Sequence, residues 1–168
     1  MIHICSLARL HATVHDTGAR HIVTLLKHTD RVERPHHILE QNHLVLGMDD
    51  ISMPIEGYVI PCEEHVNKLI CFVRAWDRAK PLVMHCFAGI SRSTAGAYVA
   101  ACALNTGRSE LTIAQELRRA SPTATPNARI IWLADRMLAR DGRMVAAIES
   151  IGRGMMAEEG HPFRLDLE

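Results

Sequence analysis

Several features that mark specialised protein classes are missing from this sequence. The 168-residue chain carries no net charge, because 19 Lys and Arg residues balance 19 Asp and Glu residues. Without a surplus of basic residues, no overall field attracts nucleic acid or an acidic membrane. No stretch approaches the roughly 18 apolar residues from which a membrane-spanning helix is recognised. We therefore expect a globular protein whose partners include neither nucleic acid nor membrane, and the sequence does not indicate its oligomeric state.

Disulfide and metal-site patterns are missing as well. The five cysteines are an odd number, lie far apart and include no C-x-x-C pair, which excludes a disulfide framework and suits a reducing compartment. The first residues lack the basic stretch and apolar core of a secretory signal, so we expect a cytoplasmic protein. His11 and His15 have the spacing of helical metal ligands, but neither a Glu nor a partnered cysteine accompanies them. We expect neither a metal nor a cofactor.

What is present predicts one ordinary folded domain. With 48% hydrophobic residues, a chain of this length can bury a sizeable core. Uninterrupted apolar runs, typical of strands covered on both faces of a parallel sheet, occupy residues 2–5, 21–26, 43–48 and 81–86. Apolar periodicity predicts helices over residues 62–78, 126–138 and 144–151. Residues 93–104 are small and apolar all round, which indicates a buried helix, and Ser109 can cap a further helix over residues 109–120.

The order of these elements indicates a single α/β domain. We predict a small, mainly parallel four-stranded sheet flanked by helices, with a helical C-terminal half. The domain should span residues 1–154, followed by a C-terminal tail of residues 155–168 that either packs as an arm or frays.

The chemistry of the chain is concentrated in residues 81–104, PLVMHCFAGISRSTAGAYVAACAL, where a buried strand, a short loop and a buried helix follow one another. Such a turn points successive backbone N–H groups into one concavity, and the helix adds its positive end, which favours an anion. Gly89 permits a loop conformation that a side chain would forbid. The Arg92 guanidinium matches two oxygens of a phosphate. The predicted lining of this anion site is Phe87, Ala88, Gly89, Ile90, Ser91 and Arg92.

Cys86 lies beside this positive site, which favours its thiolate form. A thiolate in the floor of an anion cradle suits attack on phosphorus. Ser93 is placed to donate a hydrogen bond to the sulfur and to ease its departure from a thiophosphate. His85 is expected to hold the loop by hydrogen bonds to the backbone without itself transferring protons.

The pattern H-C-x-x-G-x-x-R-S, from His85 to Ser93, resembles the signature loop of cysteine-dependent protein tyrosine phosphatases, nearest the small dual-specificity type. The resemblance spans residues 2–138, although its specific motifs cover only about thirty residues. It implies a phosphatase-like α/β fold for residues 1–154 and a phosphomonoester hydrolase that works through a cysteinyl-phosphate without metal.

The same resemblance implies a proton donor and a supporting amide. The family places its aspartate in a loop after an upstream strand, where VLGMDDISMPIEG offers Asp49 and Asp50. Asp50 fits the family pattern better, Asp49 is the alternative acid, and both carboxylates could instead merely cap a turn. In RRASPTATPNARIIWLAD, a Pro-Asn pair opens a helix behind the loop, so Asn127 would steady the loop by hydrogen bonding.

Several functions stay open at this point. The leading expectation is hydrolysis of phosphotyrosine in proteins or of small aryl phosphates, with phosphoserine and phosphothreonine admitted by a shallow pocket. Phosphoinositides or other non-protein phosphates are the alternative, although the loop has none of the lysines that lipid-acting relatives carry. A rhodanese-like sulfurtransferase and a non-catalytic phosphate-binding module are the other classes. A second cysteine that traps oxidised Cys86 also remains open.

Overall fold

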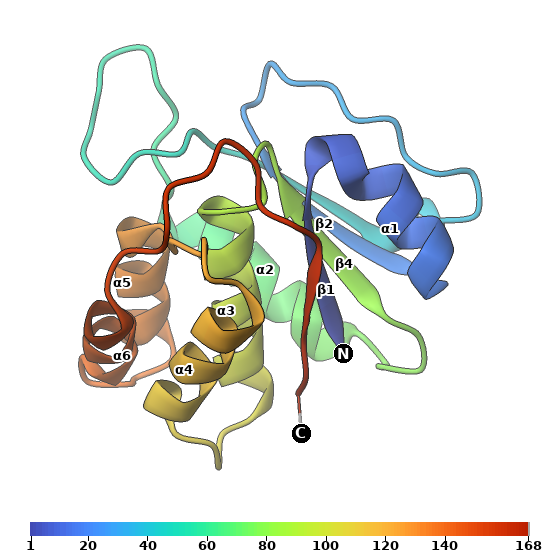
Figure 1. Cartoon of the computed structure of the whole chain (residues 1–168). Coiled ribbons are helices and arrows are strands. Elements are labelled where there is room, and N and C mark those ends of the chain that lie inside the picture. Colours follow the sequence, from blue (N-terminus) through green and yellow to red (C-terminus); the bar gives the residue numbers. More distant parts are fainter. Residues whose placement is uncertain (168) are drawn as a thin grey trace.

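A five-stranded sheet forms the centre of the computed structural model, which describes residues 1–167 (Figure 1). The strands lie in the order β3-β2-β4-β1-β5, with β1 at Ile2–Ser6, β2 at His21–Leu26, β3 at His43–Gly47, β4 at Leu82–Cys86 and β5 at Phe163–Leu165. The first four are mutually parallel, and β5 pairs antiparallel with β1. Because parallel strands end at one edge of the sheet, the segments that follow β1, β3 and β4 meet there.

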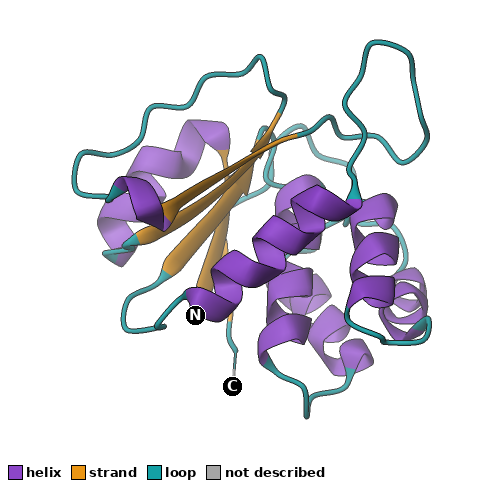
Figure 2. Ribbon diagram, turned by 180° about the vertical axis from the view of Figure 1, so that it is seen from behind, coloured by secondary structure: helices purple, strands orange, loops and turns teal. Residues whose placement is uncertain are grey.

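Helices cover both faces of the sheet, which confirms the predicted α/β class. One face is covered by α1 (Leu10–Thr17), and the opposite face by the layer of later helices (Figures 1 and 2). That layer contains α2 (Glu63–Ala75), α3 (Arg92–Leu104), α4 (Glu110–Ala120), α5 (Ala128–Met137) and α6 (Arg143–Ile151). Short 3-10 turns at Leu7–Arg9 and Glu40–Asn42 complete the elements of the described chain. None of the helices within residues 1–167 is long and apolar enough to cross a membrane.

Helix α3 is the buried centre of the larger helical layer. Its residues from Arg92 to Ala103 are all buried, and most of them are small. Small residues let the helix lie directly on the sheet: a Cβ on Gly96 would stand only 2.5 Å from the sulfur of Met84 in β4. Only residues 87–91 connect β4 to α3. Because the strand and the helix also lie in close contact, this loop must turn tightly.

The C-terminal residues account for the one difference from the predicted sheet. The sequence predicts four strands, whereas the structure has five, because residues 163–165 pair with residues 2–4 at the free edge of β1. A three-residue strand with a single neighbour lacks the uninterrupted apolar run that identifies the other four. Between α6 and β5, residues 152–162, here called the C-terminal strap, return from the helical layer to the sheet (Figure 1).

The burial of β5 predicts that the C-terminal residues contribute to the stability of the whole domain. Leu165 is only 2% exposed and belongs to the main apolar cluster. We expect Leu165→Ala to lower the free energy of unfolding by about 2–4 kcal/mol, because it leaves a cavity in that cluster. Urea unfolding measures the change. The exposed neighbour Asp166 is the matched control, and its replacement by Ala should cost less than about 1 kcal/mol. Equal, small effects would show that the tail packs independently of the core.

Candidate active site

The signature loop, residues 85–93, lies where β4 ends and α3 begins. Its tightest point is Gly89, whose φ of +73° favours glycine. A Cβ on Gly89 would also meet the carbonyl carbon of Cys5 and the nitrogen of Ser6 at 2.8 Å. The loop therefore curls closely against the end of β1. A larger residue at this position would displace the loop from β1.

The sulfur of Cys86 makes two hydrogen bonds inside this loop. The Gly89 N–H donates to Sγ at 3.3 Å, and the Ser93 hydroxyl lies 3.1 Å from Sγ. Cys86 itself is buried at the end of β4. The two contacts hold the sulfur inside the loop.

Arg92 is held rigidly although it carries a full charge. Its side chain starts at the first residue of α3 and is 5% exposed. One terminal nitrogen donates to the Met48 carbonyl at 2.7 Å, and Nε has no hydrogen-bond partner among the described residues. Because Met48 directly follows β3, this bond joins the signature loop to the segment that carries the two aspartates.

His85 is buried beneath the loop and is neutral at physiological pH. Burial, supported by the neighbouring charges of His43 and Arg92, lowers its pKa from 6.5 to about 4. Its Nε2 lies 2.7 Å from the hydroxyl of Thr24, which lies 2.8 Å from Nε2 of His43. A hydroxyl donates only once, so it donates to one imidazole and accepts from the other. Neither Thr24 nor His43 is among the predicted site residues, although a lone threonine within the apolar run HIVTLL is a usable signal.

The two candidate acids occupy different environments. Asp49 is buried, its Oδ2 accepts from the Val59 N–H at 2.8 Å, and its Oδ1 lies 3.5 Å from the Lys27 ammonium. Its backbone N–H also donates to the Val59 carbonyl at 2.7 Å, so Asp49 closes the base of the loop between residues 49 and 59. Asp50 is exposed, and its Oδ1 accepts from the Ser91 hydroxyl at 2.7 Å.

Asn127 connects Asp50 to helix α5 and to the signature loop. Its side-chain oxygen caps α5 by accepting from the N–H groups of Arg129 and Ile130, both at 3.1 Å. Its side-chain nitrogen donates to Asp50 Oδ1 at 2.8 Å, and its backbone N–H donates to the Ser91 carbonyl at 3.4 Å. The structure therefore brings the predicted residues of three separate segments together at one edge of the sheet.

The C-terminal strap supports the outer side of the signature loop, which the sequence analysis did not anticipate. The Gly160 N–H donates to the Ala88 carbonyl at 2.8 Å. A Cβ on Gly160 would stand 2.9 Å from the Gly89 carbonyl oxygen, so the two backbones touch. The Thr125 N–H donates to the Ile90 carbonyl at 2.9 Å from a second segment. No local sequence signal marks these contacts, because they depend on the path of the tail.

The remaining cysteines are unpaired, and the described residues hold no cluster of three or more His, Cys, Asp or Glu side chains suited to a metal ion. Cys5 lies in β1, next to β4, and burial raises its pKa to about 11. It packs in the smaller apolar cluster with Leu10 and Val14 of α1, whereas Cys86 belongs to the main cluster under the other helices. Cys5 and Cys86 therefore pack in different apolar clusters.

The fold and the signature loop define a phosphatase of the cysteine-dependent protein tyrosine phosphatase type. The family model described as "Polymorphic toxin system, DSP-PTPase phosphatase" matches residues 4–108, and the chain belongs to this family. It is accordingly a protein-tyrosine-phosphatase-like hydrolase of phosphomonoesters. No curated protein sequence matches the chain significantly.

Solved structures share the fold at low identity. DUSP15 is 18% identical over 94% of each chain, with a TM-score of 0.65. Human DUSP28 is 17% identical over 80% of this chain and 86% of its own, with a TM-score of 0.62. PTP-2 phosphatase from Cydia pomonella is 15% identical over 80% of this chain and 84% of its own, also with a TM-score of 0.62. At these identities, the likeness concerns the fold.

The lowered pKa of His85 predicts an acid-sensitive fold. Between pH 6.5 and 4 the unfolded chain binds a proton at this residue and the folded chain does not, so stability falls as the pH falls. Wild type should lose about 2 kcal/mol more between pH 7 and pH 5 than His85→Gln, which does not titrate. Urea unfolding at both pH values measures the difference. Identical pH dependence in the two proteins would contradict a buried neutral His85.

Proposed function

We propose that this phosphatase hydrolyses phosphotyrosine in proteins, and phosphoserine and phosphothreonine as well, with Cys86 as the nucleophile. The observation that carries the proposal is the pair of contacts on the Cys86 sulfur, from the Gly89 N–H and the Ser93 hydroxyl. Both lie within a loop that ends at the buried Arg92. An anion held by Arg92 and by the N–H groups of residues 87–92 would stand directly over that sulfur.

In the first step, the Cys86 thiolate attacks phosphorus and forms an S–P bond, while the P–O bond to the leaving group breaks. Arg92 and the loop N–H groups balance the charge on the three non-bridging oxygens. The free Nε–H of Arg92 is available for one of these oxygens, since its terminal nitrogen already binds Met48. The carboxylic acid of Asp50 gives its proton to the leaving oxygen.

In the second step, water attacks the phosphorus of the cysteinyl-phosphate. The Asp50 carboxylate takes a proton from this water, and the S–P bond breaks to release phosphate and the Cys86 thiolate. The Ser93 hydroxyl donates to the departing sulfur and stabilises its charge. His85, neutral and buried, contacts the Thr24 hydroxyl of β2 and takes no part in proton transfer. Neither step requires a metal or a cofactor.

The assignment of Asp50 as the acid rests on the contacts of the two aspartates. Both oxygens of Asp49 are engaged: Oδ2 accepts from the Val59 N–H, which closes its own loop, and Oδ1 pairs with Lys27. Asp50 is exposed, lies on the Ser91 side of the signature loop and has one oxygen, Oδ2, outside the hydrogen bonds from Ser91 and Asn127. A carboxyl group that delivers a proton needs such a free oxygen and access to the substrate.

The rim of the proposed site favours an aromatic phosphate. Phe87, the residue after the nucleophile, is 66% exposed although it is a large apolar side chain. A phenyl phosphate whose phosphorus lies over Cys86 would place its ring near Phe87, where aromatic contact adds affinity. Phosphoinositides are the second candidate substrate. The loop between Cys86 and Arg92 has no lysine to bind their additional phosphates.

The cellular setting is also part of this proposal. The family description places its members in polymorphic toxin systems, and we propose that this chain acts as the phosphatase of such a system on phosphoproteins. Its cysteines are all unpaired, and a thiolate nucleophile requires reducing conditions, so action in a cytoplasm fits the chemistry.

The role of Cys86 predicts a complete loss of turnover on removal of its thiolate. Hydrolysis of p-nitrophenyl phosphate in excess chelator should fall by at least about 10³-fold in Cys86→Ser, while tungstate binding persists. Cys71→Ser is the matched control, because Cys71 is exposed on α2 and far along the chain from the loop. Turnover near that of wild type in Cys86→Ser would reject the nucleophile. Metal-dependent turnover would reject the mechanism.

The role of Asp50 predicts a dependence on the leaving group. Asp50→Ala should slow the hydrolysis of phenyl phosphate by about 10²-fold or more, because a poor leaving group needs the proton. The loss should be much smaller with a strongly acidic phenol, which leaves without protonation. Comparing kcat for a series of substituted phenyl phosphates in Asp50→Ala and Asp49→Ala tests this. The same dependence in Asp49→Ala, and its absence in Asp50→Ala, would transfer the role to Asp49.

A further inference from the structure

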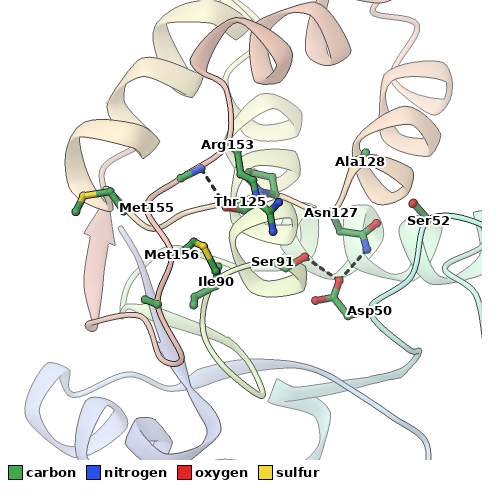
Figure 3. A pocket seen from close by; sticks show the side chains of 13 residues that line it. Asp50, Ser52, Ile90, Ser91, Thr125, Asn127, Ala128, Arg153, Met155 and Met156 are labelled. Atoms are coloured by element: carbon green, nitrogen blue, oxygen red, sulfur yellow. Dashed lines mark hydrogen bonds between the residues drawn. The ribbon is translucent and has the colours of Figure 1, made fainter.

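A second concavity opens beside the signature loop and shares residues with it. This pocket, of about 550 Å³, is lined by Ile90 and Ser91 of the loop, by Asp50, and by residues of the C-terminal strap (Figure 3). Its volume lies within the range of sites that hold small ligands or a few side chains. The pocket therefore adjoins the proposed phosphate site on the side of the proposed acid.

The strap positions one basic side chain in this pocket. Arg153 lines it, and Figure 3 shows its side chain between those of Thr125 and Asn127. The backbone on either side is fixed: the Gly154 N–H donates to the Thr125 hydroxyl at 3.1 Å, and Arg118 donates to the Gly152 carbonyl at 2.7 Å. A Cβ on Gly154 would stand 2.5 Å from the backbone of Thr123, so the strap lies in direct backbone contact with the segment that precedes α5.

Arg153 is exposed at the surface of the pocket, and no internal contact explains its place. Its guanidinium has no hydrogen bond or ion pair within residues 1–167, whereas Arg118, Arg129 and Arg140 all bind backbone carbonyls. Asp50 and Arg153 are the charged residues of the pocket lining, and Asp50 is bound by Ser91 and Asn127.

The charge of the pocket follows from the proposed mechanism. In the proposed first step Asp50 is a neutral acid. The pocket lining then carries one positive charge in the substrate complex, that of Arg153. Met155 and Met156, which are 69% and 93% exposed, add an adaptable apolar wall beside this charge.

We infer that this pocket binds an anionic side chain of a phosphopeptide, next to the phosphorylated residue, through Arg153. The inference rests on the proposed function, because it requires the phosphorylated residue to lie over Cys86. The side chain is either a carboxylate or a second phosphorylated residue, since a guanidinium forks onto both. Arg153 lies outside residues 4–108, which match the family model, so the specificity belongs to the C-terminal part of this chain.

The test measures kcat/KM at low ionic strength for phosphotyrosyl peptides that differ only beside the phosphotyrosine, with Glu, Gln, Lys or phosphoserine at the flanking positions. Wild type should prefer the Glu peptide to the Gln peptide by about fivefold, as expected for one partly exposed ion pair, and the phosphoserine peptide by at least as much. Arg153→Ala should reduce this ratio to about one, and salt should reduce it in wild type.

Two further variants separate charge from packing. Arg153→Lys should retain part of the preference, and Arg153→Glu should favour the Lys peptide over the Glu peptide. Arg74→Ala, which removes an exposed arginine of α2 outside this pocket, is the matched control and should keep the wild-type ratio. Each ratio is taken within one variant, so a common loss of turnover cancels.

The outcomes distinguish the inference from the function on which it rests. If wild type hydrolyses p-nitrophenyl phosphate and the peptides but shows no preference, or if Arg153→Ala keeps the preference, the subsite is wrong and the proposed function stands. Faster hydrolysis of phosphoinositide vesicles than of every peptide would overturn the peptide class. If reduced wild type hydrolyses neither the peptides nor p-nitrophenyl phosphate, the proposed function itself fails.

Discussion

The close approach of Gly89 to the end of β1 is the constraint on which the rest of the site depends. At this point the backbone of the signature loop touches the backbone of Cys5 and Ser6, at a distance that excludes any side chain. The Leu7 N–H donates to the Phe87 carbonyl at 3.2 Å just beside it. The loop is thereby held from outside, through its carbonyl groups. On its inner side, the Gly89 N–H donates to the Cys86 sulfur. The conformation of the loop thus rests on this contact with the end of β1, together with the hydrogen bonds that Leu7, Gly160 and Thr125 donate to its carbonyl groups.

The charged groups around the Cys86 sulfur are also fixed by contacts with the backbone. Arg92 is a buried cation beside Cys86, and its guanidinium is fixed by a backbone carbonyl rather than by a carboxylate. His85 adds no charge, because burial holds its pKa far below neutrality. Of the two acidic groups nearby, Asp49 closes its own loop and Asp50 lies at the rim. Within residues 1–167, the Arg92 guanidinium therefore has no carboxylate partner.

The C-terminal residues extend this arrangement beyond the part that matches the family. The strap contacts the loop at Gly160, completes the sheet through β5 and lines the pocket with Arg153. The C-terminal strap therefore both supports the signature loop and forms one wall of the adjoining pocket. In this way a family that shares one catalytic loop can differ in what lies beside it.

The sequence by itself determined the local features: the four strands marked by apolar runs, the helices marked by their periodicity, and the signature loop from His85 to Ser93. These follow from side-chain patterns over short stretches, where neighbours in the chain are also neighbours in space. Only the tertiary structure decided the others. It separated the environments of Asp49 and Asp50, joined Thr24 to His85, added the short β5, and placed Arg153 in the pocket that Asp50 also lines. Each of these depends on contacts between residues far apart in the chain, and such contacts leave no periodic or local signal in the sequence from which they could be inferred.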